Sequence, residues 1–328
     1  MNIKKSFLWK IGIKICWEPY QKLRIFQAKY CIKDSIENFG DDFPDKTFYI
    51  IRRRPPGTGL LSNFHWVLNH IIYAILKGYI PVVDMQNYKT FYNEESVNLP
   101  KNAWEYYFEQ PCGYSLEDIK KAKNVILGDL DKDVVVPAIQ LPDPYFGKAN
   151  ISKYYKLVSK YCKINSKTKE QLEKKKKLLF ENKSNILGVL HRGTDYKTAK
   201  YHLTPASLEQ MIEKVMQVFQ QEKFDYIFLC TEEQKAVDTF REVFAKEKVI
   251  VSDSERIKDY NDKDGITADI ISKSFSAYKN GFDYLTDLIF LSQCDGIIAS
   301  KVNGTLFALG LNNNKYRFSY LFDLGINS

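Results

Sequence analysis

Apolar runs and amphipathic segments alternate along the second half of the chain. Short apolar or β-branched runs indicate buried strands, and apolar residues spaced three and four apart indicate helices. The predicted strands span residues 185–192, 225–231, 248–253 and 295–300, and the predicted helices span 205–223, 232–247, 282–294 and 303–311. Four successive strand–helix repeats predict a doubly wound α/β domain with a parallel sheet.

The first half contains one unit of the same kind. An apolar run at 47–53 is followed by the loop RPPGTGLLSN, a helical pattern over 64–75 and a second apolar run at 80–85. A strand–helix–strand unit predicts a second parallel sheet. Residues 102–130 predict short helices and turns, and 134–139 (VVVPAI) predict one further strand.

The length of 328 residues exceeds the size at which a single core usually stops growing. We therefore predict two α/β domains, each with a parallel sheet. The predicted boundaries are 1–165 for an amino-terminal α/β domain, 166–184 for a lysine-rich linking helix and 185–328 for a carboxy-terminal domain.

Positive charge is concentrated in two segments. The chain has 48 Lys and Arg residues against 40 Asp and Glu residues, and many of its lysines fall in 1–33 and 167–183. Such segments are able to bind nucleic acid, an anionic membrane surface or a phosphorylated substrate, and the plainer interpretation is a solvated helix face. Net charge does not choose between these interpretations.

The amino-terminal segment and the cysteines bear on location. Lys10 and Lys14 interrupt the apolar residues of 1–33, so we predict neither a signal peptide nor a spanning helix there. The segment either lies on an anionic membrane surface or packs as an ordinary helix. The six cysteines form no C-x-x-C pair, which favours a reducing compartment. We expect a cytoplasmic protein, peripheral on the inner face of the membrane if the segment binds lipid.

Polar residues gather where the predicted strands of the second half end. In open α/β sheets, ligands bind beyond the carboxyl ends of the strands. These ends read HRGTD (191–195), CTEE (230–233), SD (252–253) and ASKVNGT (299–305). We therefore expect an arginine, several hydroxyl groups and several carboxylates at one edge of the sheet.

Arg192 is the first candidate at this edge. A guanidinium grips a pyrophosphate through two parallel hydrogen bonds and offsets the charge that develops as the phosphate leaves. Gly193 beside it would let the backbone approach a bulky ligand. The alternative is a structural ion pair between Arg192 and Asp195, and the residue pattern leaves both interpretations open.

Two further candidates lie nearby in the sequence. The run SKVNGT, with Ser300 and Lys301, opens a helix whose free N–H groups and hydroxyls favour an anion, although Ser300 or Asn303 could simply cap that helix. Asp287 interrupts the apolar face of the helix at 282–294. Such a carboxylate either accepts from the N1–H and N2 amino group of a guanine or is solvated on the outer face.

These residues support a resemblance to a known family. The run LHRGTDY (190–196) resembles the H-x-R-R-[GT]-D motif of the fucosyltransferase superfamily, which includes the α1,2- and α1,6-fucosyltransferases, the rhizobial nodulation fucosyltransferases and the protein O-fucosyltransferases. YIFLCTEE (226–233) is similar to its strand ending T-D-D, and YLTDLIFLSQCDGIIASKVNG (284–304) is similar to its D-x-x-F-L-S-x-A-D-x-x-V-x-T-x-S-S segment. The glycine loop and helix at 57–78 resemble its G-x-G-N element.

The resemblance implies a GT-B-like α/β fold of two Rossmann-type domains with parallel sheets and a cleft between them. It also implies GDP-fucose as donor, inversion at the anomeric carbon and no metal. Carried over by position, Arg192 holds the β-phosphate of GDP, Asp287 reads the guanine and Ser300 contacts the phosphates. In the same comparison, Glu232 and Glu233 stand where the family has two aspartates, and Asp195 matches the carboxylate of the motif.

This chain also departs from the family pattern. The histidine position of the motif is Leu190, with His191 one residue later, and its second arginine is Gly193. The α1,6 branch has a glutamate, its candidate base, five residues beyond the aspartate, and that position is Lys200 here.

The general base that inverting transfer needs is therefore not carried over. The candidates for it are Asp195 and Glu105. Trp104 and Tyr106 beside Glu105 either stack on an acceptor sugar or pack inward, and His65 either faces the cleft or is structural.

Other signals are less specific. Gly57 and Gly59 allow a donor to approach the first loop, although a simple turn fits as well. Asp129 and Asp131 form a D-x-D triplet that holds a divalent metal in one class of glycosyltransferases, but no further metal-ligand spacing supports it. We expect no metal and no cofactor.

We therefore expect a bacterial-type inverting glycosyltransferase that moves fucose from GDP-fucose to a hydroxyl of a glycan acceptor, in surface polysaccharide or lipo-oligosaccharide synthesis. One alternative keeps the fold and uses another GDP-sugar, of the GDP-heptose or GDP-mannose type. Another is a non-catalytic nucleotide- or nucleic-acid-binding protein, although we expect no nucleic-acid partner.

Overall fold

The computed structural model describes residues 34–96, 98–132, 134, 151–194, 197, 203–258, 260 and 276–325. The basic amino-terminal segment, all but the first residue of the strand predicted at 134–139, and Asp195 lie outside these described residues. Within them, no helix is both long enough and apolar enough to cross a membrane.

Five parallel strands form the sheet of the second half. Across the sheet they are β7 (Val249–Ile250), β6 (Tyr226–Cys230), β5 (Ile186–Leu190), β8 (Gly296–Ser300) and β9 (Phe318–Phe322). The chain builds outward from β5 to β7 and then returns to the other side of β5 for β8 and β9. This strand order is that of the doubly wound sheets that bind nucleotides.

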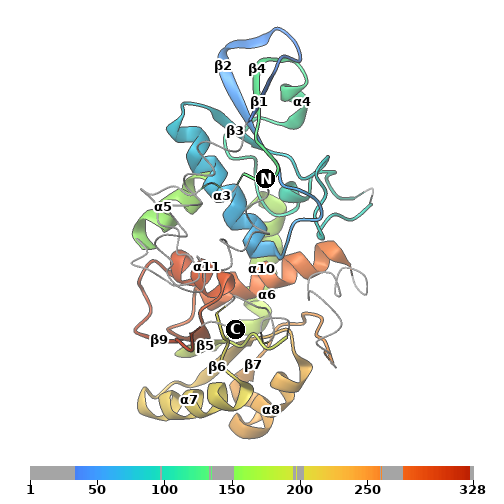
Figure 1. The fold of residues 1–328 in the computed structure, drawn as a ribbon. Helices are drawn as coiled ribbons and strands as arrows, with labels where there is room; N and C mark the ends of the chain where they lie inside the picture. Colours follow the sequence, from blue (N-terminus) through green and yellow to red (C-terminus); the bar gives the residue numbers. More distant parts are fainter. Residues whose placement is uncertain are drawn as a thin grey trace.

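Helices cover both faces of this sheet (Figure 1). They are α7 (Leu208–Gln221), α8 (Gln234–Phe244), α10 (Ala277–Leu291) and α11 (Asn303–Asn312), with the short η4 (Lys246–Lys248) before β7. Leu187 and Val189 of β5 belong to the core shared with α7 and α8, and Ile186 and Leu190 belong to the core shared with α10. Because β5 is buried on both faces, its sequence is apolar throughout.

The first half forms a smaller, mixed sheet. Its order is β1 (Ser35–Glu37), β4 (Ala122–Leu127), β2 (Asp42–Ile51) and β3 (Ile80–Val83), with β1 as an antiparallel edge and the other three strands parallel. The remaining helices are α3 (Leu60–Leu76), η2 (Ala103–Tyr106), α4 (Leu116–Ile119), α5 (Ile151–Tyr161) and α6 (Ser166–Phe180). Helix α3 connects β2 to β3, as the strand–helix–strand pattern predicts.

The parallel sheet of the second half and the mostly parallel sheet of the first half confirm the predicted α/β fold. Three strands were not predicted, namely β1, β4 and β9. Lys123 and Asn124 interrupt the apolar residues of β4, and the residues of β9 are mostly half-exposed, so neither strand has the continuous apolar run of a buried one. The domain boundaries remain a prediction, although α6 forms within the segment predicted to be a linking helix.

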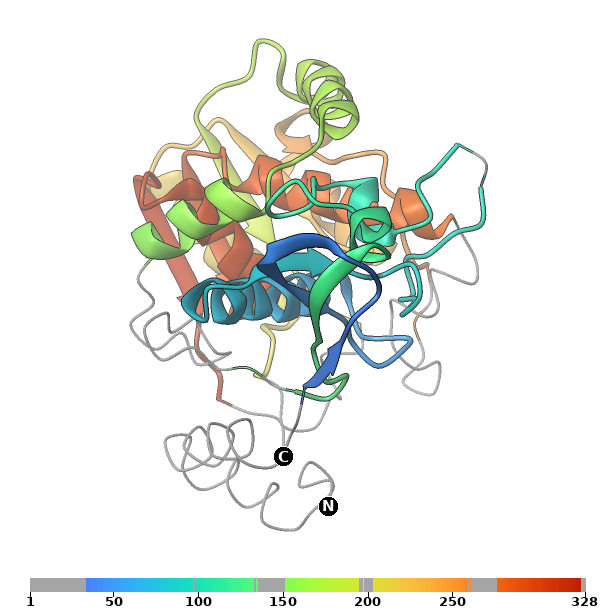
Figure 2. The same cartoon turned by 90° about the horizontal axis from the view of Figure 1, so that it is seen from above.

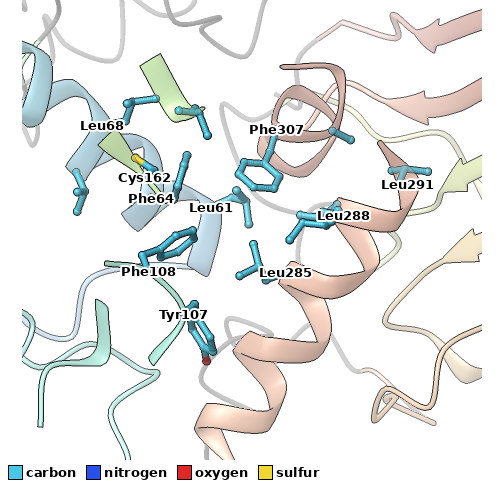
Figure 3. Packing of buried hydrophobic residues seen from close by; sticks show 14 of the residues in the cluster. Leu61, Phe64, Leu68, Tyr107, Phe108, Cys162, Leu285, Leu288, Leu291 and Phe307 are labelled. Carbon is cyan, nitrogen blue, oxygen red and sulfur yellow. The ribbon is translucent and has the colours of Figure 1, made fainter. Parts of the chain in front are cut away.

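One continuous core joins the two halves. Leu61 and Phe64 of α3, Leu285 and Leu288 of α10, and Phe307 of α11 gather in this core (Figure 3). The rings of Phe64 and Phe307 meet edge to face, with centroids 5.1 Å apart. Figures 1 and 2 show these three helices between the two sheets. The first half therefore packs directly against helices that follow strands of the second sheet.

Candidate functional site

The switch point of the second sheet brings two turns together. Strands β5 and β8 are neighbours, and the chain leaves them toward opposite edges of the sheet. In doubly wound sheets, ligands bind in the crevice at this point. The turn after β5 comprises His191–Thr194, and the turn after β8 leads from Lys301 into α11. A ligand at this edge would meet both turns.

Glu232 holds the turn after β5. Its Oε1 accepts hydrogen bonds from the backbone N–H groups of Gly193 (3.0 Å) and Thr194 (3.2 Å) and from the Thr194 hydroxyl (2.8 Å). Nη1 of Arg192 lies 3.3 Å from the same oxygen. A guanidinium, two backbone donors and a hydroxyl thus converge on one carboxylate, and the same kinds of donor bind phosphate oxygens. Glu232 is thus one partner of Arg192, and Asp195 lies outside the described residues.

Glu233 lies against Gly193 and binds His191. Nε2 of His191 is 3.1 Å from Glu233 Oε2, and Nζ of Lys197 is 3.2 Å from Oε1. Burial by itself raises the pKa of Glu233, but the hydrogen bond from His191 and the charges of His191 and Lys197 outweigh it and lower the pKa. A Cβ at position 193 would collide with the Glu233 carboxylate. A side chain at position 193 would therefore displace the end of the Glu233 side chain from its contact with His191, and this reason for a glycine differs from the predicted clearance for a ligand.

We expect the substitution Gly193→Ala to destabilise the protein by about 1 to 3 kcal/mol, because its methyl group overlaps the Glu233 carboxylate. The measurement is the midpoint of urea unfolding, which should fall with an unchanged slope. Adding Glu233→Ala makes room for the methyl group and should recover part of the loss. A Gly193→Ala protein as stable as the wild type would show that packing does not require the glycine.

Asp287 is enclosed on α10 near the loop after β7. The residue is 5% exposed. Ser254 donates a hydrogen bond of 3.3 Å to Oδ2, whereas Oδ1 has no hydrogen-bond partner among the described residues. Burial raises the pKa of Asp287 to about 7, although Ser252 and Arg256 act to lower it. The carboxyl group is therefore buried, not solvated on an outer face, and Oδ1 is a buried acceptor without a hydrogen-bond partner among the described residues.

The loop around this carboxyl group was only partly predicted. Arg256 donates from Nη1 to the carbonyl of Ser254 and from Nη2 to the carbonyl of Ser252, each at 3.0 Å, and the two serine hydroxyls are 2.6 Å apart. The strand-end pattern pointed to residues 252–253 and missed Ser254 and Arg256. The segment SDSER (252–256), with two serines and an arginine directly after a buried strand, is the signal that could have found them.

The turn after β8 uses its side chains internally. The Ser300 hydroxyl accepts from the Ala206 N–H at 2.9 Å, and Lys301 forms an ion pair with Asp323 at 2.6 Å. Helix α11 starts after Val302 with no side-chain cap, so neither Ser300 nor Asn303 acts as the predicted cap. The first N–H groups of α11 are consequently left to bind another acceptor. The donor contacts predicted for Ser300 and Lys301 remain predictions.

Asn63 fastens the glycine loop that precedes α3. Its Oδ1 accepts from the Thr58 N–H (3.2 Å) and from Arg53 Nη1 (2.8 Å), and its Nδ2 donates to the Thr58 carbonyl (2.8 Å). Gly57 has a φ of +73°, and a Cβ there would press on the Asn63 side chain. Gly59 has open space around its Cα. The turn alone explains Gly57, and donor binding by either glycine stays a prediction.

The aromatic segment of η2 packs inward. Trp104 and Tyr106 are 3% and 2% exposed. Trp104 stacks on Phe108 with ring centroids 4.5 Å apart, and the Tyr106 hydroxyl donates to the Glu94 carbonyl at 3.1 Å. Trp104 also lines a small apolar pocket beside the first turns of α3. Of the two interpretations of this segment, the inward-packing one describes both rings here, and their contact with an acceptor sugar stays a prediction.

Glu105 is engaged within the first half. Its Oε1 accepts from Nε2 of Gln110 at 2.8 Å and from Nδ2 of Asn102 at 3.3 Å. These amides orient the carboxylate and leave its other oxygen to act as an acceptor. The assignment of Glu105 as general base remains a prediction.

The D-x-D triplet and the histidine of α3 have structural partners. Asp131 pairs with Arg54 at 2.7 Å, and Asp129 accepts from the Asp131 N–H at 2.8 Å. His65 is buried, with Nε2 2.9 Å from the Tyr154 hydroxyl. Within the described ranges, no group of three or more His, Cys, Asp or Glu side chains could hold a metal ion.

The structure thus brings together four of the predicted residues of the second half, whereas Asp287, Ser300, Lys301 and the predicted residues of the first half contact other neighbours. Arg192 and Gly193 meet Glu232 and Glu233 at the ends of two adjacent strands. The molecule is a two-sheet α/β protein with a polar, partly cationic site at the switch point of a doubly wound sheet.

Neither a protein-family model nor a curated protein matches the chain. Among solved structures, it is similar to the fucosyltransferase NodZ from Bradyrhizobium, with 16% identity, coverage of 81% of this chain and 92% of that one, and a TM-score of 0.45. For NodZ α-1,6-fucosyltransferase soaked with GDP-fucose, the identity is 18% and the TM-score is 0.46. The match covers 81% of this chain and 92% of that one. For a variant of Arabidopsis thaliana FUT1 in complex with GDP, the identity is 9%. The match covers 96% of this chain and 76% of that one, with a TM-score of 0.48.

Proposed function

We propose that this protein is an inverting, metal-independent glycosyltransferase that uses a GDP-sugar, with GDP-fucose as donor and a glycan hydroxyl as acceptor. The observation that carries the proposal is the pairing of two features at one sheet edge. Arg192 stands at the switch point between β5 and β8, and Asp287 presents a buried carboxylate oxygen without a described partner. The first suits a diphosphate and the second suits the edge of a guanine.

Arg192 would bind the diphosphate and stabilise it as a leaving group. Its side chain is 17% exposed and already lies against a carboxylate oxygen of Glu232, so it is held in place before a donor arrives. Negative charge accumulates on the β-phosphate as the bond to the sugar breaks. A fixed guanidinium stabilises that charge more in the transition state than in the ground state, which is what accelerates the reaction.

Asp287 would select the base. Guanine presents an N1–H and an N2 amino group side by side, and a carboxylate can accept from both. Uracil and cytosine lack this pair of adjacent donors, and adenine presents an acceptor at N1. Because an unpaired buried carboxylate oxygen is costly, the site should bind GDP more tightly than UDP, CMP or ADP.

Transfer also needs a base on the face of the sugar opposite GDP. The acceptor hydroxyl loses its proton to that base as its oxygen attacks the anomeric carbon, and the bond to the β-phosphate oxygen breaks at the same time. Asp195, three residues after Arg192, is our first candidate for this role, and Glu105 is the second. The sugar and acceptor sites would then lie between the second sheet and the first half of the chain.

A nucleotide panel tests the proposal. We expect GDP to raise the melting temperature, with UDP, CMP and ADP having little effect at the same concentration. GDP-fucose should then be hydrolysed or transferred faster than GDP-mannose or a GDP-heptose. Equal stabilisation by all four nucleotides would contradict the assignment of Asp287. Binding to nucleic acid that falls steeply with salt, without a GDP effect, would favour the nucleic-acid alternative.

A further inference from the structure

We infer that Lys175, in the lysine-rich helix α6, is a positioning residue for Asp287, the carboxyl group that the proposed function assigns to the base of the donor. It acts through residues 252–256, which follow β7 and which we call the β7 loop. The inference rests on the proposed function, because that proposal gives Asp287 its ligand. It also gives a role to a segment whose charge alone did not choose between a solvated face and an anion site.

Lys175 differs from the other lysines of α6 in where it lies. The helix packs inward through residues spaced three and four apart, namely Thr168, Leu172, Lys175 and Leu179. The side chain of Lys175 is 21% exposed, whereas that of its neighbour Lys174 is 71% exposed. A lysine on the inward stripe of a helix needs an acceptor for its charge.

Two aspartates bind the ammonium group of Lys175. Its Nζ is 3.0 Å from Oδ1 of Asp283 on α10, and it also forms an ion pair with Oδ1 of Asp253 in the β7 loop. Burial acts to lower the pKa of Lys175, but the hydrogen bonds to these aspartates outweigh it and raise the pKa. Lys279, one turn before Asp283, donates to Oδ2 of Asp283 at 2.5 Å and to the carbonyl of Asp253 at 3.5 Å. The β7 loop is therefore fastened to α6 and α10 at Asp253.

The same loop encloses Asp287. Ser254, the residue after Asp253, donates a hydrogen bond of 3.3 Å to Oδ2 of Asp287. Arg256 closes the loop on itself, because it donates to the carbonyls of Ser252 and Ser254. With Oδ2 held by the loop, the direction of Oδ1 is set as well, and Oδ1 has no hydrogen-bond partner among the described residues. A carboxyl group that selects a base through hydrogen bonds depends on such a fixed direction.

The attachment at Asp253 lies between the two ends of the loop. The loop starts at β7, and just beyond its other end the N–H of Ile257 donates to the carbonyl of Glu232 at 2.9 Å. Without Lys175, the carboxylates of Asp253 and Asp283 would face each other with less positive charge between them, and their repulsion would move the loop away from α10. Ser254 would move with it and release Oδ2 of Asp287.

Lys174 supplies the matched control. It lies on the same helix and pairs with Glu170 at 2.6 Å on the surface, so Lys174→Met and Lys175→Met remove the same charge and introduce the same side chain. Lys279 still neutralises the buried Asp283 in Lys175→Met, which should therefore fold. Asp253→Ala removes the same ion pair from the side of the loop. Because the Asp253 side chain is 74% exposed, this second variant should fold even if the first does not.

The first measurement compares the affinities for GDP and for inosine diphosphate by isothermal titration calorimetry. Inosine diphosphate lacks the N2 amino group, so the ratio of the two dissociation constants reports the contact with Asp287 separately from overall stability. We expect Lys175→Met and Asp253→Ala to weaken GDP binding about three- to tenfold and to reduce the preference for GDP. Lys174→Met should change both values by less than about twofold.

A double variant tests the route through the loop. Ser254→Ala removes the hydrogen bond to Oδ2 directly. The variant Lys175→Met/Ser254→Ala should bind GDP no more weakly than Ser254→Ala alone, since both changes act through that one bond. Effects that add would show that Lys175 does not act through Ser254 and would overturn the inference.

The second measurement does not depend on a nucleotide. Amide hydrogen exchange in peptides that cover the β7 loop should be faster in Lys175→Met and Asp253→Ala than in the wild type, and unchanged in Lys174→Met. Unchanged exchange in Lys175→Met would overturn the inference. So would equal weakening of GDP and inosine diphosphate in proportion to the loss of thermal stability. A wild-type protein that does not bind GDP would instead refute the proposed function, and the role of Lys175 towards a donor would fall with it.

Discussion

The variant Arg192→Ala should lose transfer activity by about 30- to 1,000-fold, the equivalent of about 2 to 4 kcal/mol of transition-state stabilisation. The reason is that the guanidinium at the switch point would no longer offset the charge on the departing diphosphate. We expect the loss mainly in kcat, because this charge develops during the reaction. The measurement is the steady-state rate of transfer from GDP-fucose, with the melting temperature as a check on folding.

The structure explains why this variant should still fold. Glu232, the described carboxylate partner of Arg192, keeps hydrogen bonds from Gly193 and from both the backbone and the hydroxyl of Thr194 when the arginine is removed. The control is Arg192→Lys, which retains the charge but not the two parallel hydrogen bonds of a guanidinium, and it should lie between the alanine variant and the wild type. Turnover of Arg192→Ala within a few-fold of the wild type would contradict the role assigned to Arg192.

The second large effect concerns Asp287, where we expect stability and binding to move in opposite directions. The pKa of its carboxyl group is raised to about 7 by burial, so the folded state binds the proton more tightly than the unfolded state does. The carboxyl group therefore destabilises the folded protein increasingly as the pH rises from the pKa of the unfolded chain to about 7, and the penalty is constant above that pH. Asp287→Asn removes this penalty.

We expect Asp287→Asn to raise the free energy of unfolding by as much as about 4 kcal/mol at pH 8, since each pKa unit corresponds to about 1.4 kcal/mol. The gain should shrink as the pH falls towards 5. The same variant should bind GDP about 10- to 100-fold more weakly. The carboxylate accepts hydrogen bonds from both the N1–H and the N2 amino group of guanine, whereas the amide of Asn accepts one and places its own NH₂ group, a donor, against the other. Urea unfolding at both pH values and calorimetric titration with GDP measure the two effects.

Asp283, one turn earlier on α10, is the matched control. Lys175 forms an ion pair with its Oδ1 at 3.0 Å, and Lys279 forms one with its Oδ2 at 2.5 Å. Asp283→Asn should destabilise the protein at pH 8, because it leaves these two lysines without their buried partner. If both substitutions shift stability in the same direction, the unpaired oxygen of Asp287 is not the cause of its effect.

The sequence predicted those elements whose environment is uniform. Strands β5, β6 and β8 are buried on both faces, so their apolar runs are readable without any knowledge of their neighbours. Strands β4 and β9 are only partly buried, so neither has a continuous apolar run, and they were not predicted. The collection of polar residues at the carboxyl ends of the strands could be predicted because it depends only on parallel pairing.

Contacts between strand ends could not be read in the same way. The collision that requires Gly193 comes from Glu233, 40 residues later in the sequence, and becomes visible only when β5 and β6 are neighbours. The enclosure of Asp287 by Ser254 and Arg256 depends likewise on the path of the loop after β7. For Glu105, Trp104 and Tyr106, spacing left inward packing and acceptor binding open, and the choice depended on the neighbours of η2.

The most direct test of the proposed donor site is a crystal structure of the protein soaked with GDP. We predict the diphosphate within hydrogen-bond distance of the Arg192 guanidinium and the amino-terminal N–H groups of α11, and the guanine N1–H and N2 amino group against Asp287. A nucleotide bound elsewhere, or bound at this edge with its base away from Asp287, would contradict the account.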